Sequence, residues 1–177
     1  DRPMMTSKRE VAMSPSFAAL APEYAADWAH MTVLPDRRGE ADRMAERIAA
    51  SGARYEDVES ATAVPWYVVG LLHMREASFD FSTHLHNGDP LAARTVHVPK
   101  GRPLYGSAPY SWVESAEDAL RYDGLDRVGL WPLEVIAYRC EAYNGFGPRH
   151  HGRRSGYLWA GSSIYDGGKY VADARWD

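Results

Sequence analysis

Apolar residues recur at helical spacing along most of this chain, so the elements they predict are mainly helices. Ser111 and Glu114 form a capping box at the start of one predicted helix, and Gly52 stands where another is expected to stop. Asn144-Gly145 is a typical helix end. The predicted helices cover residues 17–31, 36–51, 54–60, 65–77, 111–122 and 131–143.

The pattern becomes strand-like between residues 82 and 99. Asn87-Gly88 is a strong reverse-turn signal, and Thr95–Val98 has the composition of a returning strand. We therefore expect a small β-hairpin, followed by a proline- and glycine-rich loop over 99–110. The fold class predicted from the pattern is mainly α with a small β-hairpin (α+β).

Residues 1–15 show no periodicity and are expected to form a loose N-terminal arm, with a single domain over 16–177. Residues 146–163 are rich in Gly, Arg and Ser and are expected to be irregular. The aromatic tail from Ile164 is expected to pack back on the domain.

Composition excludes several classes of function. The net charge is −4, which gives no support for binding nucleic acid by neutralising phosphates. No apolar run reaches the ~18–20 residues of a membrane span. Cys140 is the only cysteine, so no intrachain disulfide can form, and its place in an apolar helical pattern favours packing over catalysis. A monomer without a cofactor is expected.

The clearest chemical candidate is Glu76, which closes the apolar run 64–77 and precedes a polar segment. Desolvation at the end of a buried helix favours the neutral form of a carboxyl group. A general acid that protonates a glycosidic oxygen near neutral pH needs this property. The simpler alternative is that Glu76 pairs with Arg75 or a nearby His.

A second carboxyl group follows at Asp89, across the expected hairpin. Most glycoside hydrolysis uses two carboxyl groups on opposite sides of the scissile bond, so Glu76 and Asp89 are the candidate catalytic pair. His73 shares the helix face of Glu76, three residues away. The alternative for Asp89 is a purely structural role, because Asn-Gly-Asp-Pro is turn chemistry by itself.

Aromatic and polar residues near these positions are candidates for binding sugar rings. Tyr110, Trp112, Tyr143 and Trp159 lie at expected loop edges, where flat rings can stack on sugars. His86 alternates with His84 and could line the same cleft. The basic cluster Arg149–Arg154 could meet carboxylates of a polymer or form a solvated loop.

Two motifs carry a resemblance to a known superfamily. Glu76-Ala77-Ser78-Phe79 is similar to the Glu-Ser-x-Phe signature of goose-type lysozymes and lytic transglycosylases, with Ala77 in place of Ser. Ala142-Tyr143-Asn144-Gly145 resembles a motif that ends a later helix in those enzymes. Residues 85–91 and 157–159 also resemble uncharacterised lysozyme-family proteins of bacteria and phages. The resemblance spans 55–177.

The resemblance implies a lysozyme-like fold and a peptidoglycan hydrolase that acts at the cell wall on β-1,4 bonds between amino sugars. Glu76 would be the general acid, and Tyr143 and Asn144 would line the cleft beside it. Chitin or chitosan is a neighbouring substrate, and both a hydrolytic and a transglycosylase product are compatible with the motifs.

Two alternatives come from other classes of function. The first is an inactive lysozyme-fold module that binds glycan or has a structural role. The second is a zinc-dependent amidase or peptidase, in which His73, His84, His86 and Asp89 would converge on a metal, although the sequence has no HExxH motif.

Overall fold

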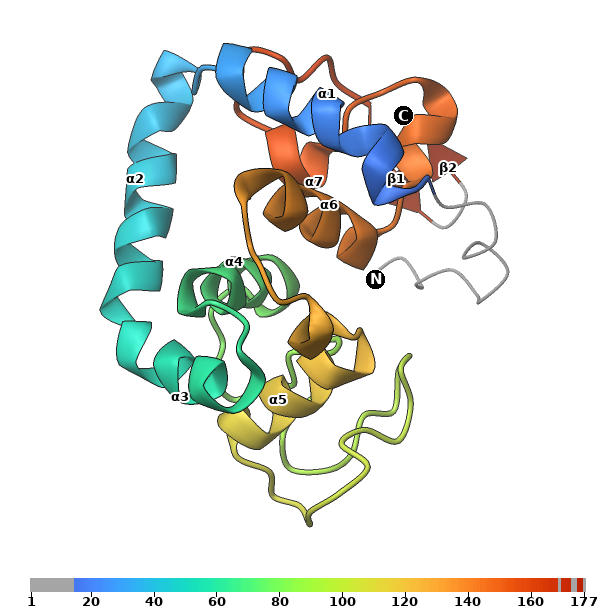
Figure 1. Ribbon diagram of the computed structural model, residues 1–177. Helices are drawn as coiled ribbons and strands as arrows, with labels where there is room; N and C mark the ends of the chain where they lie inside the picture. Colours follow the sequence, from blue (N-terminus) through green and yellow to red (C-terminus); the bar gives the residue numbers. More distant parts are fainter. Residues whose placement is uncertain (1–14, 169, 173–174, 177) are drawn as a thin grey trace. The chain divides into compact units, whose positions relative to one another are not determined.

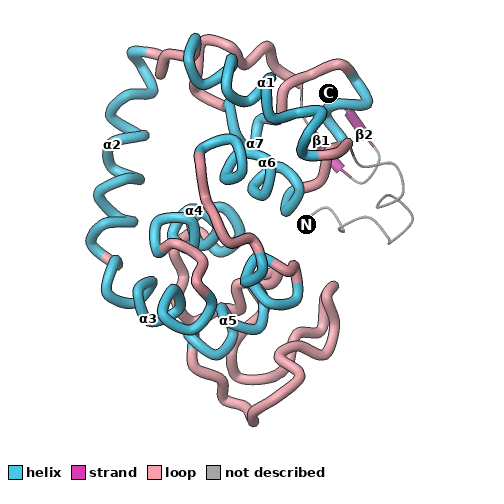
Figure 2. Tube along the Cα trace, in the orientation of Figure 1, coloured by secondary structure: helices cyan, strands magenta, loops and turns pink. Residues whose placement is uncertain are grey.

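The computed structural model describes residues 15–168, 170–172 and 175–176, and this part of the chain is mainly helical (Figures 1 and 2). Its contacts group into two compact units. The terminal unit contains the chain up to Glu40 and again from Trp131, and the central unit contains residues 41–130. The arm expected over 1–15 lies outside the described residues, apart from Pro15.

In the terminal unit, α1 packs against α6, and α6 against α7. Leu20 and Tyr24 of α1 form a buried cluster with Phe146 and Trp159, and Ile164 packs against this cluster, as expected for a tail that folds back. The elements of this unit are α1 (Phe17–His30), α6 (Leu133–Asn144), η3 (Gly147–His151), α7 (Gly156–Trp159), and the antiparallel strands β1 (Tyr170–Ala172) and β2 (Arg175–Trp176).

A buried carboxylate also joins the elements of the terminal unit. Glu141 of α6 is fully buried and accepts hydrogen bonds from the Tyr24 hydroxyl at 2.8 Å and from Arg149 Nε and Nη2 at 2.8 and 2.9 Å. Asp27 binds Arg154 through two bonds of 2.9 Å. Arg149 and Arg154, from the basic cluster noted in the sequence, therefore hold this unit together.

The central unit is built on α3 (Gly52–Thr62), which packs against α4 (Trp66–Ala77) and α5 (Trp112–Tyr122). Helix α2 (Pro35–Ala50) leads into this unit, and η2 (Leu125–Arg127) follows α5. The capping box predicted at the start of α5 is confirmed. The largest fully buried apolar side chains of the unit are Tyr55, Val58, Val64, Val68, Val69, Leu72, Leu85 and Leu120.

Gly70 allows the helices of this unit to approach closely. A Cβ atom at this position would lie 2.6 Å from Cγ2 of Ile48 on α2 and 3.1 Å from the ring of Tyr55 on α3. Real Cβ atoms do not come so close to other atoms, so a side chain here would push the helices apart. The glycine inside an apolar run therefore has a packing role.

The β-hairpin expected over residues 82–99 is not present. One isolated antiparallel bridge, Thr83 to Pro90, flanks the Asn87-Gly88 turn, and Thr95–Val98 is irregular. The reason is that side chains occupy the backbone groups that a second strand would need. The Asp89 carboxylate accepts bonds from two backbone N–H groups, at Val96 and His97, and Pro90 and Pro99 have no N–H to donate.

The other sequence predictions for secondary structure stand with small changes of bounds. The expected helix over 54–60 is longer, because Gly52 begins α3 rather than ending α2. The expected irregular stretch 146–163 contains η3 and α7. Cys140 is buried, as its apolar surroundings predicted. Each helix of the described chain is too short or too polar to cross a bilayer.

Candidate functional site

Glu76 lies in the last turn of α4 and is half-buried, in the position expected from the sequence. The helix ends because Ser78 adopts a left-handed conformation, with φ of 51°, and its N–H bonds to the carbonyl of His73. The end of α4 thus carries the partial negative charge of the helix dipole beside a carboxyl group.

Asp123 is the second carboxyl group of this region, and the sequence analysis did not select it. It is the C-cap of α5 and keeps solvent exposure. Although Asp123 is exposed to solvent, partial desolvation of its carboxyl group by the surrounding protein, followed by the negative charge of Glu76, raises its pKa from 3.8 to about 6. The charge of Arg102 opposes this shift. Two carboxyl groups from the ends of two helices are therefore close enough to affect each other's protonation.

Arg102 connects the long loop that precedes α5 to α5 itself. Its Nε and Nη2 atoms donate to the two oxygens of Asp118 at 2.8 Å each, which is a bidentate ion pair. The guanidinium also lies 4.9 Å from the ring centroid of Tyr122, the residue before Asp123. Arg102 therefore fixes the loop on the last turns of α5.

His86 completes the same network. Its Nε2–H donates to Asp118 Oδ2 at 2.8 Å, and its side chain is almost fully buried. Burial lowers the pKa of His86 to about 4, although Asp118 acts in the opposite direction. The imidazole is consequently neutral near pH 7, and His86 positions Asp118 rather than contributing charge.

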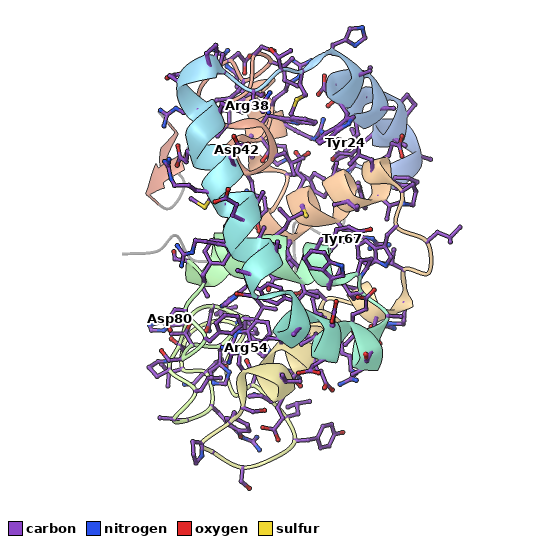
Figure 3. The ribbon with its side chains drawn as sticks, turned by 90° about the vertical axis from the view of Figure 1, so that its left-hand side faces the viewer. Tyr24, Arg38, Asp42, Arg54, Tyr67 and Asp80 are labelled. Atoms are coloured by element: carbon purple, nitrogen blue, oxygen red, sulfur yellow. The ribbon has the colours of Figure 1, made fainter. Side chains whose placement is uncertain are left out.

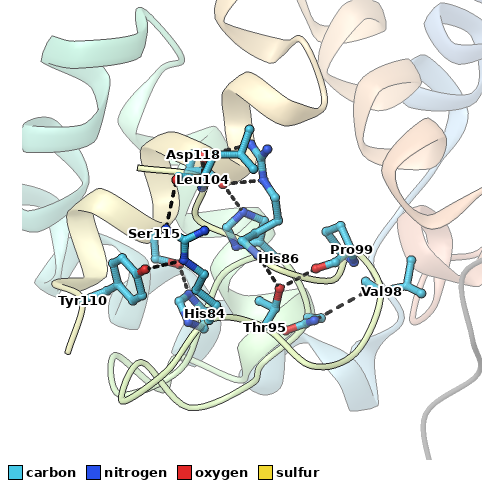
Figure 4. A network of polar contacts seen from close by, with 12 residues as sticks. His84, His86, Thr95, Val98, Pro99, Leu104, Tyr110, Ser115 and Asp118 are labelled. Carbon is cyan, nitrogen blue, oxygen red and sulfur yellow. Dashed lines mark hydrogen bonds and ion pairs between the residues drawn. The ribbon is translucent and has the colours of Figure 1, made fainter. Parts of the chain in front are cut away.

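His84 lies beside His86, with ring centroids 5.8 Å apart, and both of its nitrogens are engaged. Nε2–H donates to the Ala93 carbonyl at 2.8 Å, so Nδ1 accepts from the Ser115 hydroxyl at 2.7 Å (Figure 4). This residue joins the loop to the middle of α5. Both imidazole nitrogens of His84 are therefore hydrogen-bonded to protein groups and do not point to a metal site.

Asp89 organises the loop that follows the turn. Its side chain accepts bonds from the backbone N–H groups of Val96 and His97 at 2.8 and 3.0 Å, and from His97 Nδ1 at 2.6 Å. Burial acts to raise the pKa of Asp89, but these hydrogen bonds outweigh it and the pKa lies below its ordinary value. The geometry favours the structural reading of Asp89 over a role in proton transfer.

His73 is fully buried and lies within an aromatic cluster. Its Nδ1 is 3.0 Å from the Tyr55 hydroxyl, and the rings of Phe81 and Trp112 lie 4.4 and 4.7 Å from its centroid. The guanidinium of Arg54, which is labelled in Figure 3, lies 3.6 Å from the ring centroid of Phe81. Burial lowers the pKa of His73. His73 thus supports α4 from inside the core.

The aromatic residues expected at loop edges are all buried, at 3–8% exposure. Tyr110 and Trp112 belong to the central unit with Glu76, whereas Tyr143 and Trp159 belong to the terminal unit, together with exposed Asn144. Trp159 is part of the apolar cluster of that unit. Their rings therefore serve packing in this structure, and stacking on a sugar would need another conformation.

The four residues proposed as metal ligands do not converge. Within the described residues, no group of three or more His, Cys, Asp or Glu side chains is arranged to hold a metal ion. His84, His86 and Asp89 are hydrogen-bonded to protein groups instead, and His73 is buried among aromatic rings.

Asp123, Asp118 and Arg102 are the site residues that sequence reasoning missed. One signal was available for Asp123: a carboxylate directly after the last turn of a helix lies at the unfavourable end of the helix dipole.

A comparison of this chain with family models, curated proteins and solved structures gives no match.

Proposed function

We propose that this chain is a glycosidase of lysozyme-like type that cleaves β-1,4 bonds between amino sugars, with peptidoglycan as its substrate. The observation that carries the proposal is the coupled pair Glu76 and Asp123, in which the pKa of Asp123 is raised to about 6. Paired carboxyl groups with separated protonation are the chemistry that glycoside hydrolysis requires. The motif around Glu76 supports the same class of reaction.

In the proposed reaction, Glu76 and Asp123 together hold one proton near pH 6, so one carboxyl group of the pair is protonated and the other is ionised. Because the charges interact, that proton belongs to the pair rather than to one residue. In this proposal the proton held on Asp123 passes to Glu76, which delivers it to the leaving oxygen. The Asp123 carboxylate formed by this transfer stabilises the positive charge that develops on the sugar or orients the attacking water. Asp123 thereby takes the role that the sequence analysis gave to Asp89.

Arg102 has a positioning role in this scheme. Its bidentate bond to Asp118 keeps a positive charge close to the pair, which limits the rise in the pKa of Asp123. Without that charge, the pair would hold its proton more strongly and release it less readily to the leaving group.

The test is mass spectrometry of purified peptidoglycan after incubation with the protein, because the fragments report the bond cleaved and the type of product. Glu76→Gln should lose about 10²–10⁴-fold in rate, since glutamine keeps the shape of the side chain but delivers no proton. Glu56→Gln, at an exposed position on α3, is the matched control and should cleave at the parental rate. Parental cleavage by E76Q would refute the proposal.

The inactive glycan-binding module is the second candidate, and the burial of Tyr110, Trp112, Tyr143 and Trp159 bears on it. A module that only binds glycan needs exposed platforms, and these four rings do not provide one. Retention of the parental protein on insoluble peptidoglycan without release of fragments would favour this module over the enzyme.

A further inference from the structure

The loop between α4 and α5 presents large apolar side chains to solvent. Val96, Val98, Leu104 and Tyr105 are 63%, 52%, 52% and 85% exposed. All four lie within residues 96–105, in the yellow-green segment that extends away from α5 in Figure 1. Single exposed apolar residues are ordinary on protein surfaces, but a concentration of this kind marks a binding surface.

Several bonds hold this loop in one shape. Thr95 N–H donates to the Arg102 carbonyl at 2.8 Å, and Arg102 N–H donates to the Thr95 hydroxyl at 2.9 Å, which closes the base of the turn. Arg94 donates to the Leu104 carbonyl and to the Tyr110 hydroxyl, both at 3.0 Å. The apolar side chains are therefore displayed on a preorganised support, which lowers the entropy lost on binding.

The charge of the loop indicates the kind of partner. Residues 91–113 contain Arg94, Lys100 and Arg102 but no Asp or Glu, in a chain whose net charge is −4. The bonds described above join Arg94 to neutral oxygens, so they leave its positive charge uncompensated. An exposed apolar surface flanked by lysine and arginine is complementary to the interface of an anionic lipid bilayer.

The carboxylates that pack near the loop are each engaged with another group. Asp89 binds His97, Asp118 binds Arg102 and His86, and Glu114 binds the Ser111 hydroxyl in the capping box. Arg102 neutralises Asp118, whereas Asp89 and Glu114 accept bonds from neutral donors and keep their negative charge. Both lie outside residues 91–113, so the charges that the loop itself carries are positive.

We infer that the loop 94–105 is a docking surface for an anionic lipid bilayer, with Val96, Val98, Leu104 and Tyr105 entering the interfacial region and Lys100 and Arg94 meeting the lipid phosphates. Three of the four side chains are branched and aliphatic and gain most from contact with acyl chains, and the amphipathic ring of Tyr105 suits the interface between acyl chains and water. This chemistry favours lipid over glycan at this surface. The inference is independent of the proposed glycosidase activity.

The experiment is co-sedimentation of the full chain with vesicles of equal parts phosphatidylglycerol and phosphatidylcholine, compared with phosphatidylcholine alone. Binding should require the anionic lipid and should weaken as salt is raised. Leu104→Ser should weaken binding about tenfold, and Lys100→Gln about fivefold. No cell wall is present and no cleavage is measured, so failure of this test leaves the proposed activity unaffected.

Matched controls come from the same unit. Leu130→Ser removes a leucine that is 84% exposed but lies outside the loop, and Arg43→Gln removes an exposed cation on α2. Both should bind anionic vesicles as the parental protein does, and circular dichroism should show the parental helix content in every variant. The inference is overturned if the parental protein does not bind the anionic vesicles, or if L130S loses as much binding as L104S. It is also overturned if the parental protein is retained on insoluble peptidoglycan and L104S is not.

Discussion

Protonation of Asp123 should set the upper pH limit of cleavage. With a pKa of about 6, the fraction of the pair that holds its proton falls from about 0.9 at pH 5 to about 0.1 at pH 7. If the protonated pair is the active form, the rate should drop about tenfold over that interval. Asp123→Asn removes the group that titrates there, so the rate should fall and the pH dependence near 6 should disappear.

The assay is release of soluble fragments from purified peptidoglycan between pH 4 and 8 at constant ionic strength. Asp57→Asn, at an exposed position on α3, is the matched control and should retain the parental profile. A parental protein without a pH-dependent change near 6, or a D123N variant that keeps it, would refute the assignment of Asp123. Activity lost in E76Q but fully kept in D123N would place the second carboxyl group elsewhere.

The raised pKa of Asp123 also has a consequence for stability that needs no substrate. The folded protein holds this proton more tightly than the unfolded chain, whose carboxyl has a pKa near 3.8. The stabilising contribution is therefore complete below pH 4 and is lost as pH rises through about 6. Relative to the parental protein, D123N should gain thermal stability between pH 4 and pH 7, which differential scanning fluorimetry can measure. An equal difference in melting temperature at both pH values would contradict the assignment.

Three further predictions follow from the contacts of single residues. Glu141→Gln should cost about 1.5–3 kcal/mol in urea unfolding, because Arg149 loses its fully buried carboxylate partner while keeping its ion pair with the more exposed Glu23. Glu117→Gln, from the partly exposed pair with Arg121, should cost about 0.5 kcal/mol, and equal costs would refute the argument. Asp89→Asn should speed amide hydrogen exchange at Val96 and His97 while leaving the cleavage rate near the parental value. If D89N instead lowers the cleavage rate as much as E76Q does, Asp89 belongs to the catalytic pair. Activity should survive EDTA and a zinc-selective chelator, and a loss that zinc alone restores would favour the metalloenzyme with His73, His84, His86 and Asp89.

The sequence by itself determined the helices of this protein and several of their ends. The capping box of Ser111 and Glu114, the end of α4 just beyond Glu76 and the end of α6 near Asn144 all depend on groups a few residues apart. Helical periodicity and capping are local, because the hydrogen bonds that satisfy them join residues three or four positions apart. For the same reason, the place of Glu76 in the last turn of a buried helix could be read from the chain.

Only the tertiary structure decided which distant groups meet. Nothing local in the sequence places Asp123 in the field of Glu76, or gives Glu141 to Arg149 and Tyr24. The expected hairpin failed for a related reason: the Asp89 carboxylate and the Thr95 hydroxyl bind backbone groups that a strand would have paired. Such side-chain bonds offer the backbone an alternative to strand pairing. Which of the two forms depends on how the loop packs against α5, and the residue pattern within the loop does not encode that packing.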